Sequence, residues 1–181
     1  MRIGVYGGTF NPIHQGHLQL ALEYARRLSL DKVLLIPANI PPHKRAVQLL
    51  SGEERLELCR LACEGLPELE VSPMEISRGG SSYTVDTLRQ LSQAQPDAQL
   101  YLIVGSDMFL TLERWRESGE IFRMSHICTG ARENGELSLL KEKQQQLTLL
   151  GATSTVLDLP VFDISSTQIR RAVGLGADLK T

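Results

Sequence analysis

The chain has 181 residues, of which 42% are hydrophobic and 22% charged, a balance typical of one globular domain rather than of a disordered, collagen-like or coiled-coil protein. Its 19 lysines and arginines stand against 21 aspartates and glutamates, which gives a formal net charge of −2. Proteins that coat nucleic acid normally carry a basic excess, so we expect no nucleic-acid partner. Any anionic ligand must then be held by local geometry rather than by a broad positive field.

The cysteines and the apolar runs indicate the compartment. Cys59, Cys63 and Cys128 are too few for a disulfide framework, and we expect them to be small buried side chains. No apolar stretch of the signal-peptide type fits before the first glycine pair. Apolar runs such as Val33 to Ile36 are far below the roughly 20 residues that span a bilayer. We therefore expect a cytoplasmic protein with no membrane partner.

The first elements alternate between strand and helix patterns. Residues 3–6 form a short β-rich run, residues 18–28 carry apolar side chains at helical spacing, and residues 33–36 form a second short strand that Pro37 closes. Such a βαβ unit predicts adjacent parallel strands with a right-handed crossover. Residues 37–50 then read as an extended loop.

The alternation continues to the end of the chain. Ser51 and Glu54 form a capping box, which predicts a helix from there to about residue 64. We expect further strands at 68–72, 100–104, 126–129 and 155–157, and helices at 85–91, 121–124, 137–150 and 166–173. The glycine-rich stretch 79–82 reads as a turn.

This order predicts the fold class and the position of the ligand site. Strands that alternate with helices, with no repeat or linker between them, predict one α/β domain over residues 1–181, with a Rossmann-like, doubly wound, mainly parallel sheet and helices on both faces. Ligands bind at the carboxyl ends of the strands in such sheets. The loops that follow Tyr6, Ile36 and Val104 are therefore the candidate site.

The first of these loops reads GGTFNPIHQGH over residues 7–17. It contains neither a P-loop nor the GxGxxG fingerprint. It is still typical of a phosphate site, because two glycines expose backbone N–H groups and the loop leads into a helix N-terminus, which favours anions. His14 and His17 can point into the same space, and Gly16 between them permits close approach of a ligand. Alternatively, His14 caps the helix and His17 is a satisfied, partly buried side chain. An HxxH metal pair is disfavoured, because no third ligand lies nearby in the sequence.

A matching motif lies near the end of the chain, where residues 164–171 read ISSTQIRR. Ser165 or Ser166 can cap the helix that follows. The same helix start offers backbone N–H groups, hydroxyls and the Arg170 guanidinium to a second phosphate group. Two helix N-termini, one with imidazoles and one with a guanidinium, would suit a triphosphate.

These two motifs carry a resemblance to a known family. With HxGH at residues 14–17 and ISSTxIR at 164–170, the chain resembles the nucleotidyltransferase superfamily of α/β phosphodiesterase type. Within it the chain is most similar to the bacterial nicotinate-nucleotide adenylyltransferases, through PPHK at 41–44, SYTVDTL at 82–88, VGSD at 104–107 and the segment 112–115. The matches extend from residue 3 to about residue 171. Relatives continue beyond the ISSTxIR helix, so we expect the closing C-terminal helix of the family to be missing from this nucleotidyltransferase domain.

The resemblance implies an activity and a set of site residues. The activity is transfer of the adenylyl group of ATP to nicotinate mononucleotide in NAD biosynthesis, giving deamido-NAD and pyrophosphate, with Mg²⁺ carried by the ATP phosphates and no metal site on the protein. The substrates are then ATP and nicotinate mononucleotide, and a homo-oligomer is compatible with the sequence. The resemblance gives catalytic roles to His17, His14 and Arg170. It assigns ATP binding to Gly7, Gly8, Thr9, Phe10, Gly105, Asp107, Ser165 and Ser166. It assigns binding of the pyridine nucleotide to Thr84, Trp115, Arg116, Asn39 and Lys44.

Several residues keep a second interpretation. Asp107 could complete an Asx-type turn, Trp115 could be a core side chain, and Lys44 could be a solvated loop cation. The nearest alternative activity is that of phosphopantetheine adenylyltransferase, which shares HxGH, but the PPHK, SYTVDTL and ISSTQIR segments argue against it. A non-catalytic nucleotide-binding module on the same fold is a further alternative. A Rossmann oxidoreductase is disfavoured, because the GxGxxG motif and an acidic residue after the second strand are both missing.

Overall fold

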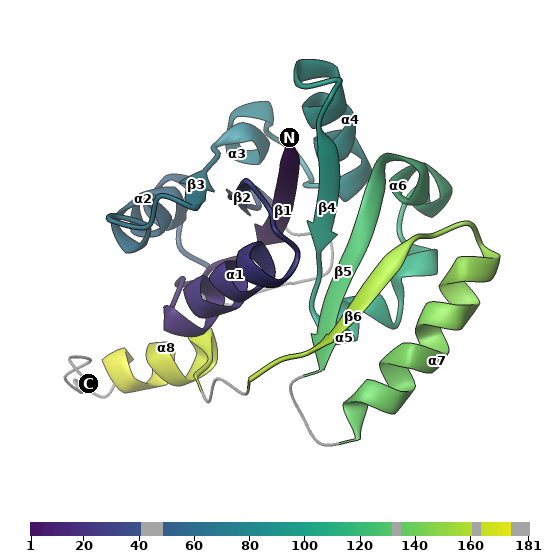
Figure 1. The fold of residues 1–181 in the computed structure, drawn as a ribbon. Helices are drawn as coiled ribbons and strands as arrows, with labels where there is room; N and C mark the ends of the chain where they lie inside the picture. Colours follow the sequence, from purple (N-terminus) through teal and green to yellow (C-terminus); the bar gives the residue numbers. More distant parts are fainter. Residues whose placement is uncertain (41–48, 132–134, 161–163, 175–181) are drawn as a thin grey trace.

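Six parallel strands form one sheet in the computed structural model, which describes residues 1–40, 49–131, 135–160 and 164–174 (Figure 1). Every pair of neighbouring strands runs parallel, in the order β3-β2-β1-β4-β5-β6. The strands are β1 (Arg2–Gly8), β2 (Lys32–Pro37), β3 (Leu69–Val71), β4 (Gln99–Ile103), β5 (Ser125–Ala131) and β6 (Ser154–Asp158). This arrangement confirms the Rossmann-like α/β fold.

The helices connect these strands and cover both faces of the sheet. They are α1 (Gln15–Arg27), α2 (Gly52–Ala62), α3 (Met74–Arg78), α4 (Thr84–Ala94), α5 (Ser106–Phe109), α6 (Ser118–Met124), α7 (Glu136–Leu149) and α8 (Ser166–Gly174), with a 3₁₀ turn η1 (Leu112–Arg114). All the strands and helices expected from the sequence are present. The structure adds α3, α5 and η1, which are too short to produce a hydrophobic period. The expected loop at 37–50 lies mostly outside the described residues.

Alternating side chains of the buried strands divide the core into two layers. In β2, Leu34 and Ile36 pack on the side of α4, α6 and α7, whereas Val33 and Leu35 pack on the side of α1 and α2. The same alternation places Val5 of β1 in the first layer. Strands with helices on both faces need apolar residues at every position, which is why these strands appear in the sequence as continuous hydrophobic runs.

The capping box that begins α2 is confirmed. The Glu54 backbone N–H donates to Ser51 Oγ at 3.2 Å, and the Ser51 N–H donates to the Glu54 carboxylate at 2.8 Å. Two otherwise unpaired donors at the helix start are thereby satisfied. Two of the expected buried thiols, Cys59 and Cys128, are fully buried, whereas Cys63 is only partly covered; all three are free.

The strand order fixes the location of a crevice. The chain moves from β1 outward to β2 and β3, then returns to the other side of β1 to form β4. The loops after β1 and β4 therefore diverge at the carboxyl edge of the sheet, where doubly wound folds bind ligands. Helix α8 lies at this same edge, at the foot of the strands in Figure 1.

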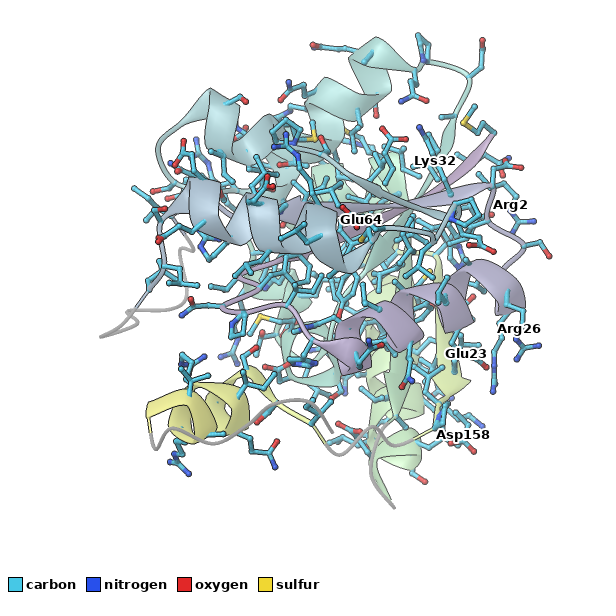
Figure 2. The ribbon with its side chains drawn as sticks, turned by 90° about the vertical axis from the view of Figure 1, so that its left-hand side faces the viewer. Arg2, Glu23, Arg26, Lys32, Glu64 and Asp158 are labelled. Carbon is cyan, nitrogen blue, oxygen red and sulfur yellow. The ribbon has the colours of Figure 1, made fainter. Side chains whose placement is uncertain are left out.

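Two of the basic side chains labelled in Figure 2 lie at the other edge of the sheet. Arg2 and Lys32 stand at the starts of β1 and β2, on the opposite side of the molecule from α8. Glu23 and Arg26 form an ion pair of 2.7 Å on α1, and hydrogen bonds from Arg26 and then Arg27 lower the pKa of the Glu23 carboxyl to about 2. Such exposed pairs contribute little to stability.

Among the helices of residues 1–40, 49–131, 135–160 and 164–174, none combines the length and the apolar character that a bilayer crossing requires.

Candidate nucleotidyltransferase site

A cavity of about 540 Å³ opens at the carboxyl edge of the sheet. Its walls come from the loop after β1, the first turn of α1, the end of β4, the segment after η1 and the first turn of α8. Fourteen sequence-predicted site residues line it: Gly7, Gly8, Thr9, Phe10, His14, His17, Thr84, Gly105, Asp107, Trp115, Arg116, Ser165, Ser166 and Arg170. Segments as far apart as residues 7 and 170 therefore meet at one site, as the motifs predicted.

The loop after β1 is held by an aromatic cluster. Phe10 has a left-handed backbone (φ 46°) and is only 3% exposed. Its ring meets Tyr6 edge to face at 5.6 Å between centroids and His17 at 5.1 Å. A Cβ on Gly8 would lie 2.8 Å from the Phe10 ring, so this glycine is required by Phe10 as well as by any ligand. The sequence predicted that Gly8 exposes its backbone N–H to a phosphate group, but not that Phe10 packs against it.

The two histidines of the HxGH motif stand together at the start of α1. His14 is the N-cap residue, and its backbone N–H donates to Nδ1 of His17 at 3.3 Å. The two rings are stacked, with 3.7 Å between centroids and 28° between planes. Because Nδ1 of His17 accepts a hydrogen bond, the proton of the neutral ring resides on Nε2. The capping and the ligand-facing interpretations of this pair are therefore compatible.

Helix α8 docks on the same loop through polar contacts. Ser166 Oγ donates to the Pro12 carbonyl at 2.8 Å, and Arg170 Nη1 donates to the Asn11 carbonyl at 2.6 Å. Ser165 is the side chain that caps α8, because its Oγ accepts the Gln168 N–H at 3.2 Å. These contacts hold the Arg170 guanidinium at the cavity, close to the start of α1.

Gly16 permits the close approach of the two helix starts. A Cβ there would lie 3.0 Å from Ile164 Cγ2 and 3.1 Å from Nδ1 of His14. Its position between the two histidines predicted close approach of a ligand. The structure gives it a second role, since it makes room for the segment that leads into α8.

The other end of the cavity is built by β4 and α4. Gly105 is the N-cap of α5, and Asp107 lies in its first turn. Thr84 begins α4, and Trp115 follows η1 and packs partly against the core. The Arg116 guanidinium lies over the Tyr83 ring at 4.6 Å from its centroid, where a cation and a π face attract. Trp115 thus both supports the core and lines the cavity.

A buried carboxyl that was not predicted from the sequence also lines this end. Glu75 of α3 is 6% exposed and accepts the Thr87 hydroxyl at 2.6 Å. Burial raises the pKa of the Glu75 carboxyl, although hydrogen bonds from Thr87 and Ser82 and the charge of Arg78 act in the opposite direction. No motif marks this residue, because α3 is too short to show a period.

Two predicted pyridine-site residues are not placed in the cavity wall. Asn39 follows β2, and its side chain donates to the Gly80 carbonyl at 2.9 Å instead. Lys44 lies outside the described residues. The assignments of Asn39 and Lys44 stay predictions.

The ionisable residues of the site are few. Around the cavity stand two histidines, Arg116, Arg170, Asp107 and Glu75. Within residues 1–40, 49–131, 135–160 and 164–174, no three histidine, cysteine, aspartate or glutamate side chains gather as metal ligands. The arrangement is suited to holding a phosphate chain with N–H donors at the end where α1 and α8 meet, and a planar ring beside Trp115 at the other end.

Comparison with known proteins agrees with this geometry. The cytidylyltransferase-like family model matches residues 5–172. A protein of Marinobacter nauticus named probable nicotinate-nucleotide adenylyltransferase is 43% identical over 185 residues, covering 95% of this chain and 85% of that protein. A protein of the same name from Shewanella frigidimarina is 36% identical over 195 residues, covering 100% of this chain and 92% of that protein.

A solved structure shares the fold. Plasmodium falciparum nicotinic acid mononucleotide adenylyltransferase complexed with NaAD has a TM-score of 0.79 to this chain at 16% identity, covering 98% of this chain and 86% of that one. The family match, the two relatives and the position of the HxGH and ISSTxIR motifs on one cavity lead to the same assignment. The chain belongs to the nicotinate-nucleotide adenylyltransferase family, a branch of the cytidylyltransferase-like proteins.

Proposed function

We propose that the protein transfers the adenylyl group of ATP to nicotinate mononucleotide, releasing pyrophosphate and forming deamido-NAD. One observation carries the proposal: the starts of α1 and α8 meet at one cavity, and its wall contains His14, His17 and Arg170 together with Trp115, which we assign to the pyridine ring. The names of the relatives are consistent with this activity.

The chemistry needs no nucleophile from the protein. The attacking group is the phosphate of the mononucleotide, whose second pKa of roughly 6 leaves it mostly ionised at neutral pH. A phosphate oxygen attacks the α-phosphorus of ATP, a new P–O bond forms, and the bond to the bridging oxygen breaks as pyrophosphate leaves. The task of the protein is to align the two groups and to stabilise the charge that develops on the α-phosphoryl oxygens.

The donors at the phosphate end fit that task. Nδ1 of His17 accepts the His14 N–H, which places the proton of the neutral ring on Nε2, and we assign this Nε2–H to a phosphoryl oxygen. Arg170 adds a fixed positive charge, held in place by its hydrogen bond to the Asn11 carbonyl. We assign the backbone of residues 7–10 and the first turn of α8, including Ser165 and Ser166, to the ATP phosphates as well.

The remaining assignments divide the two nucleosides. Gly105 and Asp107 line the cavity, and by the family resemblance we assign the Gly105 backbone and the Asp107 carboxylate to the nucleoside of ATP, with the carboxylate accepting ribose hydroxyls. Trp115 would stack on the pyridine ring, while Thr84 and the backbone of Arg116 would hold its carboxylate. Asn39 and Lys44 are assigned to the pyridine nucleotide on the resemblance of the sequence alone.

The metal and the cellular setting complete the proposal. Mg²⁺ would enter as Mg-ATP, held by the phosphate oxygens, as the resemblance to the family implies. We further propose that the chain acts as one nucleotidyltransferase domain, because a single sheet carries the six strands of the described residues. A cytoplasmic location and the absence of a nucleic-acid partner are proposed from the sequence, which has a net charge of −2.

The test is pyrophosphate release with Mg-ATP and three acceptors in parallel: nicotinate mononucleotide, nicotinamide mononucleotide and phosphopantetheine. We expect the first to give the highest kcat/KM. A preference for phosphopantetheine would overturn the proposed substrate. Equal use of the two mononucleotides would leave adenylyl transfer intact but contradict selection of the acid over the amide. No turnover with any acceptor, despite ATP binding, would favour a non-catalytic nucleotide-binding module.

A further inference from the structure

Arg55 is a buried arginine outside the cavity that makes no ion pair in the described chain. It lies on α2 with 1% of its surface exposed. Its three nitrogens donate to backbone carbonyls of three separate segments: Nε to Leu50 at 3.0 Å, Nη1 to Thr9 at 2.8 Å and Nη2 to Asn39 at 3.2 Å. No carboxylate among the described residues lies within 4.0 Å of the guanidinium nitrogens, although Glu53 is close enough for a weaker attraction.

A buried arginine without an ion pair lowers the stability of the fold compared with an apolar side chain, so we expect its hydrogen-bond geometry to serve a purpose. Taking a guanidinium out of water carries a free-energy penalty, and hydrogen bonds to carbonyls offset this penalty without adding a net gain. Burial accordingly lowers the pKa of Arg55 from its usual value. An apolar side chain of similar volume would pack this position without that penalty. The planar fork of arginine, with donors in fixed directions, is what an apolar residue cannot supply.

Each of the three carbonyls belongs to a segment at the edge of the proposed site. Thr9 lies in the loop after β1 and lines the cavity. The Leu50 N–H donates to Asn11 Oδ1 at 3.1 Å, and the Asn11 carbonyl in turn accepts Arg170 at 2.6 Å. Through these contacts Arg55 is connected to the phosphate end of the cavity.

The third contact leads to the opposite end. The Asn39 backbone N–H donates to Ser82 Oγ at 2.8 Å, and its side chain donates to the Gly80 carbonyl. Ser82 hydrogen-bonds Glu75, and the next residues, Tyr83 and Thr84, begin α4 at the ring-binding end. Arg55 is therefore the point at which the hydrogen bonds from both ends of the cavity meet.

We propose that Arg55 is a positioning residue that fixes the phosphate end and the pyridine end of the site relative to each other, through the carbonyls of Thr9 and Asn39. The inference rests on the proposed adenylyl transfer, because it concerns the alignment of two substrates. Arg55 does not line the cavity, so it acts without touching either of them. In-line attack is sensitive to such alignment, and a misplacement of about 1 Å can cost on the order of 100-fold in rate.

Two substitutions of Arg55 and one control test this role. Arg55→Met keeps much of the volume and removes all three donors. Arg55→Lys keeps the charge but presents one ammonium in place of the fork, so it cannot reach three divergent carbonyls. Cys59→Ala is the control: Cys59 is fully buried one turn further along the same helix, near Arg55, and it is not among the residues that line the cavity. The variant loosens the packing of α2 beside Arg55 while all three donors of the guanidinium stay in place.

The expected result is a separation of turnover from binding. With Mg-ATP and nicotinate mononucleotide, Arg55→Met lowers kcat by on the order of 100-fold, while the Kd of each substrate measured alone by calorimetry changes less than about threefold. Arg55→Lys recovers no more than about a tenth of the lost turnover. Cys59→Ala keeps kcat within about threefold of the original protein, even if its melting temperature falls as much as that of Arg55→Met. A normal kcat in Arg55→Met, an equal loss in Cys59→Ala, or a loss explained entirely by weaker Kd values would overturn the inference.

A second measurement does not depend on the substrate assignment. Hydrogen exchange of the ligand-free protein should show faster exchange in Arg55→Met over residues 9–11, 39–40 and 49–50, with β5 unchanged. If the original protein turned over none of the acceptors, the proposed function would fail, and this exchange result would still decide whether Arg55 orders both ends of the cavity. Unchanged exchange in these segments would refute the positioning role.

Discussion

Substitution of His17 by alanine should remove most of the turnover and leave the fold intact. The change deletes one preorganised donor, Nε2–H, at the developing charge of the transition state. Loss of a single donor of this kind costs about 100- to 1,000-fold in kcat, or roughly 3–4 kcal/mol. Because the contact strengthens in the transition state, KM for ATP should change less than kcat.

The cost to stability follows from the contacts of the ring. His17 accepts the His14 N–H at 3.3 Å and meets Phe10 edge to face at 5.1 Å. Losing a cap contact costs about 1 kcal/mol, and losing an aromatic pair costs about 0.5–1.5 kcal/mol. Their sum is well below the 5–15 kcal/mol typical of a folded domain, so His17→Ala should still unfold cooperatively.

Two further substitutions at this position separate the cap from the donor. In His17→Asn the side-chain oxygen can replace Nδ1 as acceptor, but no donor reaches the place of Nε2. In His17→Gln the amide N–H₂ reaches about as far as Nε2, and the cap contact is weakened. Pyrophosphate release under saturating substrates should therefore rank Gln above Asn, with Asn close to Ala.

Two outcomes would contradict this reasoning. The first is a His17→Ala protein whose kcat stays within tenfold of the original. The second is a His17→Asn protein more active than His17→Gln, because activity would then follow the cap contact rather than the donor. Circular dichroism and thermal melts of each variant exclude a trivial loss through unfolding.

Three more outcomes are expected. Trp115→Ala should raise the Kd for nicotinate mononucleotide about tenfold through loss of stacking, while calorimetry with an ATP analogue shows little change; an unaffected mononucleotide Kd would place the ring elsewhere. Gly16→Ala should lower kcat on the order of tenfold, since its Cβ would lie 3.0 Å from Ile164 Cγ2 and displace α8. Gly119→Ala is the matched control, because no neighbouring atom lies within 4 Å of its Cβ, and its kcat should be unchanged. The free energy of unfolding of Glu75→Gln, relative to that of the original protein, should increase as the pH rises from 4 to 8 in urea titrations. A carboxyl whose folded pKa is raised above the unfolded value of 4.5 gives stability that is present at low pH and lost as the pH rises through the folded pKa, and glutamine does not titrate. A difference in unfolding free energy that does not change with pH would contradict the raised pKa.

The long elements were predictable because their signals are local. Residues 33–36 are apolar at every position, which is what a parallel strand covered on both faces requires. The capping box of Ser51 and Glu54 spans three residues, so its hydrogen bonds can be inferred without knowledge of the tertiary structure. The gathering of the HxGH and ISSTxIR motifs was predictable for another reason, since the fold class itself fixes which loops share an edge.

The remaining features depend on contacts between distant residues. Arg55 stands in a polar first turn and resembles a solvated helix residue, yet it is buried because Thr9, 46 residues away, supplies one of its acceptors. The helix at Met74–Arg78 is one turn long, so Glu75 carried no periodic signal. Gly8 could be identified from its place after a strand, but its contact with Phe10 depends on a left-handed backbone that the sequence does not reveal.

Helix α8 completes the site but adds little to the core, and this has a consequence for local unfolding. None of its residues, Ser166–Gly174, is buried, and its described anchors to the rest of the chain are mainly polar, at Asn11 and Pro12. An element held this way opens at a small fraction of the global unfolding free energy. A bound triphosphate that contacts both helix starts would be present only in the closed form, so by mass action it would raise the opening free energy of α8. Nucleotide affinity and the order of this helix are therefore both set by the equilibrium between the open and closed positions of α8.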